Sequence, residues 1–279
     1  MIEAKNGQLK IGLALGSGGA RGLAHIGVIK VLEKNNIPID FIAGSSIGAM
    51  VGGFYAAGLD ISKIEEIALE TNWRRLFSLV DPHLKQGLIG GEKVKVFIDD
   101  HIKGKRIEDC EIPFIAVATD LKTGDVAILN RGPLAEAIRA SVSIPLVFRP
   151  AEIDGKMLAD GGLSAPVPVE IVRQMGADIV IAVNLDKHYF DEKWKLGWYD
   201  IANDSLDILR HHLALSNVAG ADIVIDIDVG KNYWYQFVNG QDKISTGEEA
   251  MSRALPKLKE MINKKSRSGL KKYFDFFRG

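Results

Sequence analysis

Short apolar runs alternate with amphipathic stretches along this chain. Residues 9–15 form an apolar run that predicts a buried strand, and apolar positions from Leu23 to Leu32 then recur at helical spacing. The same succession follows at once: residues 41–43 predict a second short strand, and a helix rich in small residues is expected up to Gly58. A glycine-rich turn separates strand from helix both times. Two strand–turn–helix units in succession indicate a parallel α/β sheet.

The rest of the chain predicts further elements of both kinds. Helices are expected over residues 59–69, 93–102, 133–141, 167–175, 200–218 and 248–262, and strands over 114–121, 126–129, 151–153, 156–158, 179–185 and 223–229. Two of the strand pairs enclose short turns that are typical of hairpins. The run over 179–185 is apolar enough for a central strand. The expected fold class is therefore α/β with a mainly parallel central sheet.

A single domain is expected over residues 1–256, because no internal repeat, low-complexity block or linker interrupts the pattern. Its motif-bearing core is placed at residues 9–187, and C-terminal helices and a strand at 188–256. Residues 257–279 form a tail in which basic residues predominate and which ends in aromatic ones. Such a tail suits peripheral contact with an anionic membrane, and a solvated helix end explains the same composition.

Composition and charge argue against several classes of protein. The 279 residues carry 35 basic and 36 acidic side chains, a formal net charge of -1, so the basic excess that nucleic-acid binding needs is missing. The single cysteine, Cys110, cannot form an internal disulfide, and no Cys and His cluster has zinc spacing. No run reaches the roughly 18 apolar residues of a spanning helix, and no secretory pattern is present. We expect a cytoplasmic protein, with contact at the inner membrane surface left open.

Glycine is in excess, at 29 residues, and eleven of these lie between Gly12 and Gly58, the stretch that holds both strand–helix turns. The second turn, Gly44-Ser45-Ser46-Ile47-Gly48, fits the pattern G-x-S-x-G, with the required strand before it and helix after it. In that motif the serine stands on a strained turn that exposes its hydroxyl at the carboxyl edge of the sheet. Ser46 is therefore a candidate nucleophile. The alternative is a helix start at which Ser46 only caps free N–H groups.

The first turn, Gly16 to Gly22, presents several backbone N–H groups in one direction and favours an anion. A dinucleotide fingerprint needs a glycine where Arg21 stands and an acidic residue at the end of the second strand, whereas Asp40 precedes that strand. A phosphate loop needs a Gly-Lys-Ser/Thr ending, which is missing here. An oxyanion hole needs donors beside a nucleophile, and adjacent parallel strands bring this loop to the same sheet edge as Ser46.

A serine nucleophile needs a base, because its hydroxyl is unreactive at neutral pH. A triad in the order Ser–Asp–His requires a late histidine. His188 lies nearest to the end of a predicted strand, whereas His211 and His212 fall within a predicted helix. The alternative base is Asp160, which follows a predicted hairpin strand and precedes two glycines that allow another backbone to approach closely. The residues alone leave both bases open.

Three motifs occur in a fixed order: Gly-Ala-Arg-Gly at residues 19–22, Gly-Ser-Ser-Ile-Gly at 44–48 and Asp-Gly-Gly at 160–162. The segment from Arg139 to Pro145, with Phe148 and Pro150, precedes the last of them. This arrangement resembles the patatin-like phospholipase family, in particular its short bacterial members, from about Ile11 to Met175. The resemblance implies a three-layer α/β/α fold, hydrolysis of acyl esters of lipids, and a Ser–Asp dyad in place of a triad. It also implies neither metal nor organic cofactor.

Carried onto this chain, the resemblance makes Ser46 the nucleophile and Asp160 the general base. The oxyanion donors that it implies are backbone N–H groups of Ser17, Gly18 and Gly19, chiefly the two glycines. The residues expected to support the motifs are Gly16, Arg21, Gly22, Gly44, Gly48, Gly161 and Gly162. Of these, the arginine is expected to hold the loop or an acidic partner. The implied partner is a lipid or acyl ester, whose head group and chain length are left open, as is the oligomeric state.

Two other functions stay open. An α/β-hydrolase esterase would use a catalytic histidine, although Ser46 comes very early in the chain for that fold. A nucleotide- or phosphate-binding regulatory module would use the glycine loop for phosphate. A set of apolar residues before residue 85 fits either a lid over the site or part of the core: Leu76, Phe77, Leu79, Val80 and Leu84.

Overall fold

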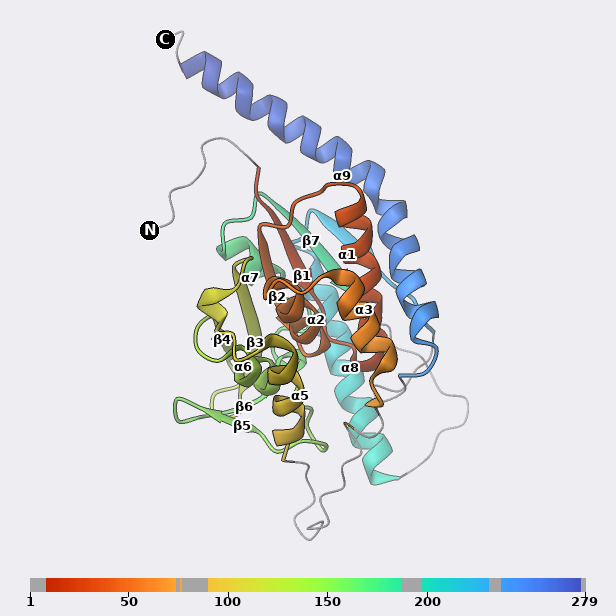
Figure 1. Ribbon diagram of the computed structural model, residues 1–279. Helices are drawn as coiled ribbons and strands as arrows, with labels where there is room; N and C mark the ends of the chain where they lie inside the picture. The colour runs from red at the N-terminus through yellow and green to blue at the C-terminus, as the bar shows by residue number, and fades with distance from the viewer. Residues whose placement is uncertain (1–8, 74–75, 77–89, 187–196, 231–236, 277–279) are drawn as a thin grey trace.

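An eight-stranded mixed sheet forms the centre of the computed structural model, which describes residues 9–73, 76, 90–186, 197–230 and 237–276 (Figure 1). In these residues the strand order is β5-β6-β3-β2-β1-β7-β8, and β4 pairs with β3 beside this path. The strands are β1 (Ile11–Leu15), β2 (Phe41–Ser45), β3 (Phe114–Asp120), β4 (Val126–Leu129), β5 (Ala151–Ile153), β6 (Lys156–Asp160), β7 (Ile179–Asn184) and β8 (Ile223–Asp226). Neighbouring strands pair in parallel along the run β3-β2-β1-β7-β8. Strands β4, β5 and β6 join the sheet through antiparallel pairs.

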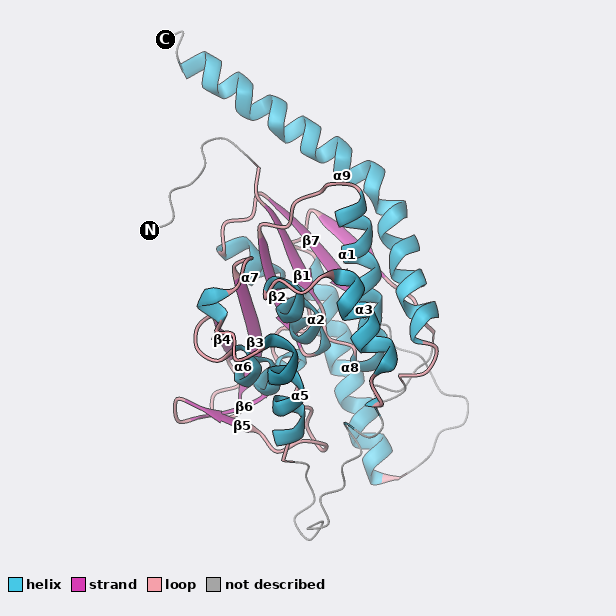
Figure 2. Ribbon diagram, in the orientation of Figure 1, coloured by secondary structure: helices cyan, strands magenta, loops and turns pink. Residues whose placement is uncertain are grey.

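Helices cover both faces of the sheet (Figure 2). They are α1 (Ala24–Lys34), α2 (Ile47–Ala56), α3 (Ile61–Glu70), α5 (Glu92–Ile102), α6 (Leu134–Ser141), α7 (Val169–Gln174), α8 (Trp198–Val218) and α9 (Gly240–Phe276). Side chains alternate along each strand, so Leu13 and Ile42 join the core with α1, α2, α3, α5, α6 and α9. Ala14 and Ala43 face the other side, where α7 and α8 pack. The predicted three-layer α/β/α fold, with a mainly parallel sheet, is confirmed.

The sheet gathers three chain segments at one edge. In the parallel register Leu15 of β1 is paired with Gly44 of β2 on one side and with Val183 of β7 on the other. The residues that follow these three strands therefore meet at the carboxyl edge, where parallel α/β sheets usually bind their ligands. Both glycine-rich turns found in the sequence lie there.

Helix α9 is longer than the pattern predicts at both ends. It runs over Gly240–Phe276, whereas the expected helix covers residues 248–262. Gly247 and Pro256 lie within it and weaken the helical signal, but packing along α1 compensates. Its C-terminal end extends beyond the body of the molecule (Figure 1). The expected boundary between residues 256 and 257 falls inside this continuous helix.

No helix in the described ranges combines the length and the apolar character that crossing a bilayer requires. Of the residues considered as a lid, Leu76 packs against the main core. Phe77, Leu79, Val80 and Leu84 lie outside the described residues.

Candidate active site

Ser46 stands on the turn between β2 and α2 in the conformation of a nucleophile turn. Its φ of 55° lies in the left-handed region that side chains rarely adopt. The turn leaves no room beside it: a Cβ on Gly44 would lie 2.3 Å from the Gly48 carbonyl oxygen, and one on Gly48 would lie 2.2 Å from that of Leu15. The Ser46 side chain makes no capping hydrogen bond to α2. The alternative of a simple helix cap therefore does not hold, and the hydroxyl has another partner.

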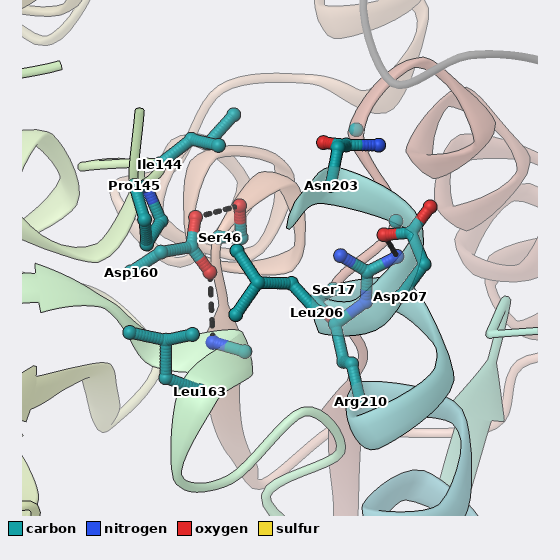
Figure 3. Close-up of a pocket in the computed structure, with 13 residues that line it drawn as sticks. Ser17, Ser46, Ile144, Pro145, Asp160, Leu163, Asn203, Leu206, Asp207 and Arg210 are labelled. Carbon is teal, nitrogen blue, oxygen red and sulfur yellow. Dashed lines mark hydrogen bonds and ion pairs between the residues drawn. The ribbon is translucent and has the colours of Figure 1, made fainter. Parts of the chain in front are cut away.

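That partner is Asp160, at the end of β6. Ser46 Oγ donates a hydrogen bond of 2.6 Å to Asp160 Oδ2, across 114 residues of sequence (Figure 3). The other carboxylate oxygen, Oδ1, accepts from the N–H of Gly162 at 2.7 Å. Strand β3 lies between β2 and β6, and its pairing with each places the two ends together: Ser45 pairs with Val117 in the β2–β3 register, and Asp160 pairs with the next residue of β3. The structure thus brings the predicted nucleophile and base into direct contact.

The end of α6 and the residues after it hold the backbones of this pair. The Ser46 N–H donates to Ser141 Oγ at 2.8 Å, and that hydroxyl donates to the Val117 carbonyl at 2.5 Å. The Asp160 N–H donates to the Ser143 carbonyl at 3.0 Å. All of these groups are buried. In the sequence this segment stands out only through the family resemblance, whereas its contacts show that it holds nucleophile and base in register.

The environment of Asp160 suits a general base. Burial raises its pKa from the ordinary 3.8 to about 6, because a charged carboxylate is poorly solvated there. The hydrogen bonds from Ser46 and Gly162 and the nearby charge of Arg210 oppose this rise without cancelling it. A carboxylate with such a pKa is ionised at neutral pH and still basic enough to take a proton from a hydroxyl during reaction.

The glycine loop supplies two candidate oxyanion donors. Gly18 and Gly19 both have positive φ, at 152° and 57°, which turns successive N–H groups toward one side. Within the described part of the chain these two N–H groups have no acceptor, and both residues line the cavity at Ser46. The Ser17 N–H, in contrast, donates to the Pro166 carbonyl at 2.8 Å. The N–H of the predicted third donor is therefore already bonded, and the Ser17 hydroxyl donates to Asp186.

Asp186, a residue outside the predicted site, joins this loop to α8. Its carboxylate is 3% exposed and accepts hydrogen bonds from Ser17 Oγ at 2.8 Å and from Arg210 Nε at 2.7 Å. Arg21 Nη2 lies 3.4 Å from the same carboxylate, and Arg21 Nε donates to the Gly18 carbonyl. The expected role of Arg21, holding the loop and an acidic partner, matches this geometry. Asp186 follows strand β7 at the carboxyl edge of the sheet, and this position is the sequence signal that points to it. Arg210 lies inside a helix, where the sequence carries no such signal.

The hydroxyl opens into a cavity of about 50 Å³. The glycine loop, Ser46 and Asp160 line it. In Figure 3, Ile144, Pro145 and Leu163 lie on the side of Asp160, and the lining residues of α8 lie on the opposite side: Asn203, Leu206, Asp207 and Arg210. The volume is enough for a few water molecules but not for an acyl chain. Helix α8 thus borders the cavity beside Ser46, and we refer to it as the roof of the site.

Histidines occupy other places in the described part of the chain. His25 is fully buried, its Nε2–H donates to the Gly16 carbonyl oxygen at 2.8 Å, and burial lowers its pKa to about 4. His211 contacts the backbone carbonyl of Asp186. Among the described residues, no histidine lines the cavity, and no three His, Cys or acidic side chains lie close enough together to hold a metal ion. His83 and His188 lie outside the described residues.

Comparison with known proteins gives the family. Residues 13–173 match the model of the patatin-like phospholipase family, and the chain belongs to that family. An uncharacterized NTE family protein of Mycobacterium bovis is 45% identical over 178 residues, which cover 63% of this chain and 49% of that protein. Lysophospholipase NTE1 of Yarrowia lipolytica is 36% identical over 181 residues, covering 63% of this chain and 12% of that protein. The matching region thus spans at most about half of these relatives.

The fold has solved counterparts. VipD from Legionella pneumophila superposes with a TM-score of 0.54 at 16% identity, covering 90% of this chain and 67% of VipD. At this identity the likeness concerns the fold. The family match ends near α7, so Asp186 and the roof helix α8 lie beyond it.

Proposed function

We propose that this protein is a serine acyl hydrolase that cleaves fatty-acyl ester bonds of lipids, with Ser46 as nucleophile and Asp160 as general base. One observation carries the proposal: the 2.6 Å hydrogen bond from Ser46 Oγ to Asp160, beside two unbonded glycine N–H groups. Family membership supports the class of reaction, and the name of the Yarrowia relative, a lysophospholipase, supports a lipid substrate.

The reaction follows from these contacts. Asp160 Oδ2 takes the proton as Ser46 Oγ bonds to the ester carbonyl carbon, and the oxyanion accepts hydrogen bonds from Gly18 and Gly19. The C–O bond to the alcohol then breaks, and the alcohol leaves with the proton from Asp160. Water, deprotonated by Asp160, attacks the acyl carbon, the bond from that carbon to Ser46 Oγ breaks, and Asp160 returns the proton to Oγ as the fatty acid leaves. Each oxyanion donor contributes about 3–4 kcal/mol of transition-state stabilisation.

We propose that α8 shifts to admit the substrate, because the cavity of about 50 Å³ is too small for an acyl chain. Leu206 points from α8 toward the Ser46–Asp160 pair (Figure 3). The side of α8 that faces away carries exposed apolar side chains, among them Trp198, Ile201 and Leu209. An exposed outer side suits a helix that has to move.

The basic end of α9 is proposed to touch an anionic membrane. Two of its lysines are already engaged by the protein: Lys259 bonds to Asn35, and Lys265 to Asp178 and Asp222. Membrane contact therefore falls to the part beyond Lys265. Truncation after Asn263 should weaken binding to anionic vesicles and leave the hydrolysis of a water-soluble ester unchanged; equal vesicle binding by the two forms refutes the contact. A cytoplasmic location stays a prediction.

The cavity argues against the phosphate-binding alternative. Asp160 and Asp207 both line it, and the charge of Arg210 is already taken by Asp186 and Asp207. A phosphate group there would face two carboxylates and one neutralised cation, an arrangement that repels it. A nucleotide screened by thermal shift is expected to produce no stabilisation.

The test of the proposed function is hydrolysis of a panel of acyl esters by three proteins. Wild type should release fatty acid, and Ser46→Ala should fall to the uncatalysed rate. Ser45→Ala is the matched control, because the Ser45 hydroxyl is buried next in sequence and has no partner among the described residues. Activity retained by Ser46→Ala, or lost equally in both variants, would rule out Ser46 as nucleophile.

A further inference from the structure

Asp186 is the one carboxylate, among the described residues, that touches both flanks of the glycine loop. It accepts from Ser17 Oγ on the N-terminal flank and pairs with Arg21 on the C-terminal flank. The two glycines between these flanks, Gly18 and Gly19, are the proposed oxyanion donors. Asp186 contacts neither of them and does not line the cavity. Its influence on the reaction therefore passes through other residues.

The path from Asp186 to the donors is short. Arg21 Nε donates to the Gly18 carbonyl at 3.1 Å, and the Arg21 N–H donates to the same oxygen at 3.2 Å. A trans peptide is planar, with its C=O and N–H pointing in opposite directions. Holding the Gly18 carbonyl on Arg21 therefore aims the Gly19 N–H away from Arg21. Ser17, fixed by its hydroxyl to Asp186 and by its N–H to Pro166, anchors the other end of the loop.

The charge of Asp186 matters as well as its shape. Arg21 is 6% exposed, and the Arg210 side chain is mostly buried where it contacts Asp186. Both guanidinium groups therefore need a nearby counter-charge. An amide at position 186 would still accept from Ser17 but would no longer offer a negative charge to Arg21. Losing this charge should loosen the hold of Arg21 on the Gly18 carbonyl.

We propose that Asp186 is a positioning residue for this hydrolase: its buried carboxylate, through Ser17 and Arg21, holds the Gly18 and Gly19 N–H groups where the oxyanion forms. The inference rests on the proposed function and adds to it a residue beyond the region that matches the family. It predicts that Asp186 affects the stabilisation of the transition state rather than the binding of the ester.

The test compares Asp186→Asn with wild type in two measurements, each per active site counted by fluorophosphonate titration. The kcat for a soluble ester should fall about 10- to 100-fold with KM little changed. The inhibition constant of a long-chain alkyl trifluoromethyl ketone should rise by a similar factor, because its serine adduct places an oxyanion on the same donors. A residue that only supports the fold would lower the number of active sites and leave both values unchanged.

Asp222→Asn is the matched control. Asp222 also binds an arginine, at 2.6 Å, and a backbone N–H, but it does so before β8, at the opposite edge of the sheet. The Asp222→Asn variant should be less stable than wild type but have the same kcat and the same inhibition constant per active site. If Asp186→Asn does not fold, Ser17→Ala replaces it, since that change removes only the 2.8 Å contact. In this variant kcat should fall and the inhibition constant should rise, each by about 5-fold.

Unchanged kcat and inhibition constant in Asp186→Asn, or in Ser17→Ala where that variant is used, would overturn the inference. Failure of the proposed function is a separate result: wild type itself would then hydrolyse no acyl ester and take no fluorophosphonate label.

Discussion

Ser46 Oγ and Asp160 Oδ2 lie 2.6 Å apart although 114 residues separate them, and burial raises the pKa of Asp160 to about 6. The proposed reaction needs the ionised form of Asp160. We therefore expect kcat/KM to rise with pH through an apparent pKa of about 6 and to level off above it. The measurement is a pH profile with a soluble ester, with circular dichroism at each pH as the control for folding. An acid limb centred near 4, the value of an unperturbed carboxyl, would contradict the account.

The same burial makes Asp160 costly for stability. Its pKa is higher in the folded chain than in the unfolded one, so the native state loses stability as pH rises from about 4 to about 6, by about 3 kcal/mol in all. Asp160→Asn cannot ionise, and its amide can still accept from Gly162. This variant should be inactive and yet more stable than wild type above pH 6, with the difference vanishing below pH 4. Urea unfolding at several pH values measures this.

Asp222 should change the stability of the fold with pH in the opposite direction to Asp160. Burial tends to raise its pKa, but the hydrogen bonds from the Val180 N–H and from Arg173, with the charge of Lys265, outweigh burial and lower it. Its contribution to stability is present above the unfolded pKa and is lost as pH falls through the folded one. Asp222→Asn should therefore be less stable than wild type at neutral pH and approach it in acid. If both asparagine variants changed stability in the same direction at neutral pH, burial would not be what raises the pKa of Asp160.

Ser141 tests how the nucleophile turn is held. Ser141→Ala leaves the buried Ser46 N–H without its acceptor, which should cost about 1–3 kcal/mol of unfolding free energy. The turn has a strained φ, so we also expect kcat to fall about 10-fold or more through misplacement of Ser46 Oγ. Ser45→Ala serves as the control for a lost buried hydroxyl. A full kcat in folded Ser141→Ala would mean that the turn needs no such support.

Leu206 tests the roof. Leu206→Ala enlarges the cavity, so kcat/KM for long-chain esters should increase relative to short-chain ones, and Leu206→Trp should reverse that preference. Leu209→Ala is the matched control on the same helix, because Leu209 is 67% exposed and does not line the cavity. The ratio of the two specificity constants is the measurement. A ratio that stays constant in both Leu206 variants would exclude α8 from substrate access.

The local part of the site could be predicted from the sequence, because each motif is a short run with its own backbone requirement. The strand before Ser46 and the helix after it are readable from hydrophobic spacing, and the glycines around it are readable from the turn. The residues alone made Asp160 one of two candidate bases, and only the resemblance chose it, since the pairing that brings it to Ser46 is a property of strand order. Chain order does not reveal that β3 lies between β2 and β6.

Other parts depend on tertiary contacts that leave no local pattern. The role of Asp186 depends on side chains from three separate segments, and Arg210 is one charged residue in an amphipathic helix. The Ser17 N–H was expected to point into the site, but the carbonyl of Pro166, far along the chain, takes it. The length of α9 was missed because its packing on α1 overrides the weak propensity of Gly247 and Pro256.

The central claim is that Ser46 is the nucleophile and that Asp160 activates it. An alkyl fluorophosphonate reacts with an activated serine, and mass spectrometry of the digested protein locates the adduct. We expect a single adduct on Ser46 in wild type, none in Ser46→Ala, and strongly slowed labelling in folded Asp160→Asn. An adduct on another residue, or labelling of Asp160→Asn at the wild-type rate, would contradict the account.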